Sequence, residues 1–145
     1  MHRKPILFAT DFSRASGAAL EQAVDLAKAK KTEMIIAHAV VYPGPTDTEG
    51  MVFPQVYEEL EGQIRKHATR RLAAVIQKVK KLGVRATGVM LRGVPHQEIT
   101  KLARSRHAEM IVVGTHGRTG FSRLVVGSVA GRIVAAASCP VLTVR

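Results

Sequence analysis

Short apolar segments alternate along this chain with longer amphipathic segments. The short segments are continuous apolar runs, which are typical of strands covered on both faces. In the longer segments apolar residues recur every three or four positions, the period of a helix with one buried side. The pattern predicts strands at residues 5–10, 34–37, 85–91, 110–113 and 140–144. It predicts helices at residues 14–31, 55–82, 95–106 and 128–137.

Strands that alternate with helices favour βαβ units and a parallel sheet, so we expect the α/β class with helices on both faces. The length of 145 residues suits one domain, and the chain contains no internal repeat. We therefore expect one doubly wound domain over residues 1–145.

Residues that start or stop helices sharpen these boundaries. Ser13 suits the N-cap of the first helix, Gly83 the end of the second, and Pro95 the first turn of the third. Five Pro and Gly residues between positions 42 and 54 predict a long loop. A second loop, rich in glycine, is predicted at 114–127.

Ligands of open parallel sheets bind beyond the carboxyl ends of the strands, where the strand order reverses. Residues 9–11 follow the first predicted strand and residues 38–40 follow the second. The segment after the fourth strand, 114–128, is the most informative, because its glycines allow backbone amides to converge on a phosphate. The start of the last helix at Ser128 adds unpaired N–H groups, and Arg118 and Arg123 add charge. The alternative is a surface loop in which Ser128 is an ordinary N-cap.

Several familiar catalytic and phosphate-binding motifs are missing. The sequence has no Gly-Lys pair for a Walker A loop, no Gly-x-Gly for a dinucleotide fingerprint, no Gly-x-Ser-x-Gly and no His-Glu-x-x-His. His116 lies in the glycine loop without an identifiable partner, and we expect His38 to be a core or turn histidine. Cys139 is expected to be a small buried apolar residue. The sequence therefore indicates binding, with at most slow turnover.

The charge is strongly basic, with 22 Lys and Arg against 11 Asp and Glu and a net charge of +11. Such a field attracts anions in general. Aromatic residues, which stack on single-stranded bases, make up 4% of the chain, so we expect mostly solvated charge, and the charge alone is weak evidence for a nucleic-acid partner. A single cysteine excludes an internal disulfide. The sequence shows neither a membrane-spanning run nor a signal peptide, so we expect no membrane association and a cytoplasmic location.

The spacing Gly114-x2-Gly117-x9-Gly127-Ser128 resembles the nucleotide-binding signature of the universal stress protein family, G-x2-G-x9-G-[S/T]. The resemblance extends over essentially the whole chain. It includes residues 6–13, 35–38, the Gly93-x-Pro95 turn and residues 139–144. It implies five parallel strands in the order 3-2-1-4-5, and ATP bound across the carboxyl edge.

By position, the resemblance implies a set of nucleotide-binding residues, with Asp11 directed to the ribose or to a phosphate-bound Mg²⁺ or Mn²⁺. Ala9 replaces a proline that is frequent in the family. The implied residues are Ala9, Thr10, Asp11, Ala39, Val113, Gly114, Gly117, Gly127, Ser128 and Val129.

The resemblance also implies a homodimer through the apolar edge strand 140–144. The leading hypothesis is an ATP-binding regulatory or sensing dimer in the stress response. One alternative is a weak metal-dependent ATPase or nucleotidyl-transfer enzyme. A second is a nucleic-acid-binding module that uses the basic face of the helix at 55–82.

Overall fold

The computed structural model describes residues 3–42, 53–115 and 127–145. Within these residues, strands and helices alternate without exception. The elements are β1 (Ile6–Ala9), α1 (Arg14–Lys30), β2 (Met34–Val40), α2 (Pro54–Lys81), β3 (Ala86–Arg92), α3 (Pro95–Ser105), β4 (Met110–Gly114), α4 (Ser128–Ala136) and β5 (Val141–Val144).

The strands form one parallel sheet in the order β3-β2-β1-β4-β5, which confirms the predicted fold class and strand order. Alternate side chains of the central strands enter two separate hydrophobic clusters. Ile6 and Phe8 pack with α1 and α2 on one face, whereas Leu7 and Ala9 pack with α3 and α4 on the other. The sheet is therefore covered on both sides, as the continuous apolar strands predict.

The predicted helix signals are confirmed by the local geometry. Ser13 caps α1 through its side chain, which accepts a hydrogen bond from the Ser16 amide. Gly83 follows α2 with a φ of +86°, a conformation that favours glycine. Pro95 opens α3, where its missing N–H is not needed.

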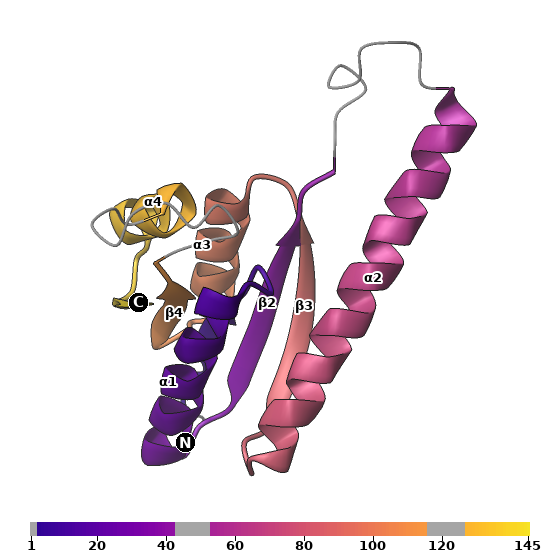
Figure 1. Ribbon diagram of the computed structural model, residues 1–145. Coiled ribbons are helices and arrows are strands. Elements are labelled where there is room, and N and C mark those ends of the chain that lie inside the picture. Colours follow the sequence, from indigo (N-terminus) through magenta and orange to yellow (C-terminus); the bar gives the residue numbers. More distant parts are fainter. Residues whose placement is uncertain (1–2, 43–52, 116–126) are drawn as a thin grey trace.

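The long helix α2 covers the sheet with its C-terminal half only. Leu72 and Val79 are buried against β2 and β3, and Gly88 lets the helix approach closely, because a Cβ there would lie 2.5 Å from Ile76 Cδ1. The N-terminal half projects well beyond the carboxyl end of the sheet (Figure 1). No helix in the described part of the chain is both long and apolar enough to cross a membrane.

Two predicted strand ends at the site are corrected by the structure. β2 continues to Val40, so His38 and Ala39 lie inside the strand instead of after it, because pairing with β3 extends the ladder to Arg92. Gly114 is the last residue of β4, paired with Val144. α4 begins at Ser128, as predicted, and its N-cap is Gly127, so the alternative in which Ser128 is the N-cap is wrong.

Candidate functional site

A cleft of about 770 Å³ opens at the carboxyl edge of the sheet, between β1 and β4, where the strand order reverses. This is the place at which parallel sheets bind ligands. Its walls come from the ends of β1, β2 and β4, the first turns of α1, α3 and α4, and the N-terminal half of α2. The volume lies within the range of about 300–1,000 Å³ that is usual for small-molecule sites.

Nine of the ten residues predicted for the site line this single cleft. Gly117 lies outside the described residues, as do His116, Arg118, Arg123 and most of the predicted loop at 42–54. The nine are Ala9, Thr10, Asp11, Ala39, Val113, Gly114, Gly127, Ser128 and Val129.

The turn between β1 and α1 is held by its own polar side chains. The Thr10 hydroxyl accepts a hydrogen bond from the Phe12 amide (3.0 Å) and shares another with the Ser16 hydroxyl (2.6 Å). Asp11 Oδ1 accepts from the Ser13 amide at 2.9 Å. This bond orients the carboxylate at the cleft and uses one of its oxygens, which leaves the other for a ligand.

Phe12 occupies the left-handed region with a φ of 63°, which is unfavourable for a bulky residue. Its ring lies 4.3 Å from the ring of His38, centroid to centroid. The Arg71 guanidinium lies 5.2 Å from the centre of the same ring and donates to the Phe12 carbonyl oxygen at 3.1 Å. Residues of β2 and α2 therefore fix the turn that presents Asp11.

His38 is buried, with 9% of its surface exposed, and its Nδ1 donates to the Thr10 carbonyl oxygen at 2.8 Å. The expectation of a core histidine is confirmed. This bond ties β2 to the same turn, so His38 acts on the cleft through Thr10 and Phe12.

The first turn of α4 presents backbone amides to the cleft. The N-cap Gly127 provides no side chain to accept from them, and its φ and ψ of −52° and 151° are those of an ordinary cap. The Gly127 amide donates to the Thr115 carbonyl oxygen (2.6 Å), which fixes the entry of the helix. The first amide that bonds back to Gly127 is that of Gly131. The N–H groups of Ser128, Val129 and Ala130 therefore form an anion-binding end with the positive pole of the helix dipole.

Gly114 has a packing role in addition to its place in the cleft. A Cβ at this position would lie 3.3 Å from the carbonyl oxygen of Ala15 in the first turn of α1. The glycine thus lets β4 and α1 approach closely, which brings the Asp11 turn and the α4 amides to the same opening.

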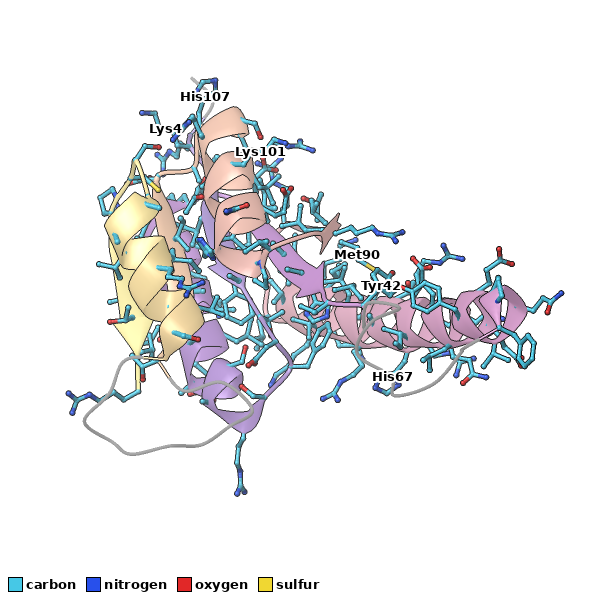
Figure 2. All side chains as sticks on the ribbon, turned by 90° about the horizontal axis from the view of Figure 1, so that it is seen from above. Lys4, Tyr42, His67, Met90, Lys101 and His107 are labelled. Atoms are coloured by element: carbon cyan, nitrogen blue, oxygen red, sulfur yellow. The ribbon has the colours of Figure 1, made fainter. Side chains whose placement is uncertain are left out.

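The sequence did not point to the wall that α2 adds to the cleft. The upper half of α2 contributes Leu60, Gln63, Ile64 and His67, and α3 adds Pro95 and Ile99. Figure 2 shows His67 on this part of α2. The apolar residues at positions 56, 60 and 64 continue the apolar stripe that packs on the sheet. Because this stripe is longer than the sheet, it could have indicated that α2 also lines the cleft.

An ion pair holds this half of α2 to the strands. Arg92 at the end of β3 contacts Glu61 at 2.6 Å and lies 4.8 Å from the centre of the Tyr42 ring.

The described lining of the cleft contains Asp11 but no Lys or Arg.

The described residues contain no group of three or more His, Cys, Asp or Glu side chains that could hold a metal ion by itself. Cys139 is half-buried and packs against the cluster of α3 and α4, and burial raises the pKa of its thiol. This agrees with the expected small apolar residue, although Cys139 is less enclosed than predicted.

Comparison with known proteins identifies the family. Residues 2–145 match the model of the universal stress protein family. Universal stress protein YxiE of Bacillus subtilis is 33% identical over 146 residues, which cover 97% of each chain. Universal stress protein MJ0531 of Methanocaldococcus jannaschii is 32% identical over 98% of this chain and 82% of its own.

Solved structures show the same architecture. The protein MJ0577 superposes with a TM-score of 0.85 at 25% identity, covering 99% of this chain and 96% of its own. Two more distant structures share the fold and contain nucleotides. They are a universal stress protein from Archaeoglobus fulgidus in complex with dAMP (TM-score 0.71, 22% identity, 100% of both chains) and a universal stress protein in complex with cAMP (TM-score 0.67, 23% identity, 100% and 98%). From its whole-length match and its relatives, this chain belongs to the universal stress protein family.

Proposed function

We propose that the cleft binds an adenine nucleotide, with ATP as the ligand, and that the protein is a cytoplasmic regulatory or sensing dimer in the stress response. The observation that carries the proposal is the convergence of the uncapped α4 amides and the Asp11 turn in one opening. The dAMP and cAMP complexes of proteins with this fold support the ligand class.

The two ends of the cleft suit the two ends of a nucleotide. The amides of Ser128, Val129 and Ala130 suit phosphate oxygens, since they are unpaired donors at the positive end of a helix dipole. The walls near Ala39, Val40 and Leu60 are apolar and suit the base, with the Ala39 backbone in contact with its edge. In this arrangement Asp11 lies on the ribose and phosphate side, with Thr10 and Gly114 behind it.

The donor set fits a divalent ion that arrives with the nucleotide. Asp11 is the carboxylate of the described lining, and one carboxylate plus phosphate oxygens is the usual environment of Mg²⁺. Mg²⁺ or Mn²⁺ would offset the charge of the phosphates, and the Asp11 side chain would assist in holding it.

Substitution at Gly127 tests the phosphate end of the cleft. Gly127→Asp places a carboxylate where it accepts the hydrogen bonds of the first α4 amides, the groups proposed to bind phosphate. Asp is a better N-cap than Gly by a few tenths of a kcal/mol, so this variant should be at least as stable as the natural protein. Isothermal calorimetry with ATP, ADP and AMP, each with and without Mg²⁺, measures the affinities.

We expect Gly127→Asp to lose at least 100-fold in ATP affinity, because it both occupies the amides and repels phosphate. Gly127→Asn, which caps the helix without charge, should lose less, and Gly127→Ala should remain close to the natural protein. Equal ATP affinity in all four proteins would refute the proposed cradle. Tighter binding of AMP than of ATP would refute the triphosphate assignment and keep the ligand class.

The proposed dimer uses β5, which lies at the edge of the sheet with half-buried side chains. Thr143→Lys places a charge on this edge and should block pairing. Sedimentation equilibrium should then change from dimer to monomer, while the mass of an Arg132→Gln control stays that of the dimer. A natural protein that sediments as a monomer would overturn this part of the proposal.

A further inference from the structure

Basic side chains gather at the end of the molecule opposite the cleft. The amino end of the sheet is formed by the final turns of the helices, the connections that lead from them into the strands, and the N-terminal residues. The cleft end is formed by the first turns of the helices, the connections that lead into them, and the C-terminal residue. The amino end of the sheet holds 11 of the 22 Lys and Arg residues, against two acidic residues, Glu33 and Glu109. We name this surface the basic pole. It consists of Arg3, Lys4, Lys28, Lys30, Lys31, Lys78, Lys80, Lys81, Arg85, Arg104 and Arg106.

The cleft end, compared in the same way, is electrically balanced. Its described residues are two cations, Arg14 and Arg145, and two acids, Asp11 and Glu98. Most of the net charge of +11 therefore lies away from the proposed nucleotide site. Attraction of the nucleotide to the cleft does not explain it.

Hydrogen bonds and an ion pair join the connections at the pole. The Arg3 guanidinium donates to the Lys30 carbonyl oxygen, and Lys30 Nζ lies 2.5 Å from Glu109 Oε1. Backbone bonds link Glu109 to Pro5 (2.9 Å) and Arg85 to Met34 (2.8 Å). In Figure 2, Lys4 and His107 lie at the same end of the molecule, away from His67 on the cleft wall.

The helix dipoles do not neutralise this surface. The C-terminus of each helix contributes roughly half a negative charge, so the four helices together supply about −2. That is small against the excess of cations, ten of which are exposed, with Lys30 half-buried. The mutual repulsion of these cations destabilises the folded protein.

We propose that the basic pole binds the sugar–phosphate backbone of a double-stranded nucleic acid without reading its sequence. The sheet spans three strand spacings from β3 to β4, about 14 Å. A duplex carries about one negative charge per 1.7 Å of its axis, so about 14 Å offers roughly eight charges. The charge of the pole and that of the duplex segment are thus matched in number.

The chemistry of the surface favours a duplex over the other polyanions. Phe, Tyr and Trp side chains, on which the bases of single strands stack, are absent from the described residues at this end of the molecule. An acidic membrane is usually bound by an apolar face together with cations. The large exposed apolar residues at this end are Leu82, directly after α2, and Val134 on α4, so they belong to different elements.

Two variants of α2 with the same loss of charge test the assignment. Lys78, Lys80 and Lys81 are changed together to Gln at the pole, and Arg65, Lys66 and Arg70 are changed together to Gln on the same helix, nearer the cleft. All six positions are exposed, and Gln is a good helix former, so both proteins should fold. Fluorescence anisotropy with a labelled DNA duplex of mixed sequence, measured over a range of salt concentrations, reports binding.

We expect the natural protein to bind the duplex, with an affinity that falls steeply with salt. The pole variant should show a slope of log K against log salt that is shallower by up to about 2.7, since each lost phosphate contact removes about 0.9. The control variant should keep the natural slope, and saturating ATP should leave both curves unchanged.

Three results would overturn the proposal. The first is an equal loss of duplex affinity in the two variants, which would mean a general effect of net charge. The second is no binding of the natural protein to the duplex at low salt. The third is binding to phosphatidylserine vesicles but not to the duplex. None of these depends on the cleft, so failure here is distinguishable from failure of the nucleotide proposal.

Discussion

The left-handed Phe12 turn makes Arg71 a residue that should control both stability and ligand binding. A side chain in this conformation costs about 1–2 kcal/mol, and the contacts to Arg71 and His38 offset that cost. Arg71→Gln removes a hydrogen bond to the Phe12 carbonyl, about 1 kcal/mol, and a cation–π contact, about 0.5–1 kcal/mol at an exposed site.

The expected loss of stability is therefore about 1.5–2 kcal/mol. In a domain of this size, 1 kcal/mol corresponds to about 3–4 °C in Tm, so thermal unfolding should shift down by about 5–8 °C. Calorimetry with ATP should also show weaker binding, because the turn that presents Asp11 is populated less.

A double-mutant cycle with Phe12→Gly tests whether the loss of stability in Arg71→Gln comes from its contacts with Phe12. Glycine adopts the left-handed conformation without strain and has no ring for Arg71 to cover. In that background Arg71→Gln should cost about half as much, since only the hydrogen bond to the carbonyl remains. Arg70→Gln, which removes the same charge from the neighbouring position, is the control. Equal losses in both backgrounds, or an equal loss for Arg70→Gln, would refute the reasoning.

The remaining predictions concern two glycines, one carboxylate and one thiol. Gly114→Ala forces a Cβ against the backbone of α1 and should lose about 1–3 kcal/mol of stability. Gly88→Ala meets the flexible end of Ile76 and should lose less, and calorimetry should show weaker ATP binding for Gly114→Ala only. Asp11→Asn should weaken ATP binding more with Mg²⁺ than without it, and equal weakening would exclude a role of Asp11 at the metal. Because burial raises the pKa of Cys139, the rate of its alkylation by iodoacetamide should rise at higher pH in the folded protein than in urea. The unfolded chain loses the thiol proton first, so the free energy of unfolding should decrease as the pH increases above the pKa of the thiol in the unfolded state. Coincident pH profiles in the two states would contradict that assignment.

The parts of the fold that depend on local pattern were predictable from the sequence. The apolar runs of β1 and β4 and the Gly83 and Pro95 signals carry their meaning within a few residues. The segment from Gly114 to Ser128 likewise pointed to the carboxyl edge of the sheet, and its described ends lie in the cleft there.

Other parts of the site depend on contacts between distant segments. Phe12 is a poor candidate for a left-handed turn by itself, and it adopts one because His38 and Arg71 pack against it. The apolar stripe of α2 looks uniform in the sequence. Only the length of the sheet decides that Leu72 belongs to the core and Leu60 to the cleft.

The overhang of α2 gives the cleft a mechanical connection to the surface. The helix packs on the sheet around Leu72, and its N-terminal half overhangs the sheet (Figure 1). The exposed Phe53 directly precedes the helix as its N-cap. Nineteen residues at 1.5 Å each place this tip of the helix about 28 Å from Leu72. A tilt of about 5° produced at the cleft wall would displace the tip by about 2.5 Å over that length. The length of the overhang therefore means that a small movement of the cleft wall would become a larger movement at the exposed tip.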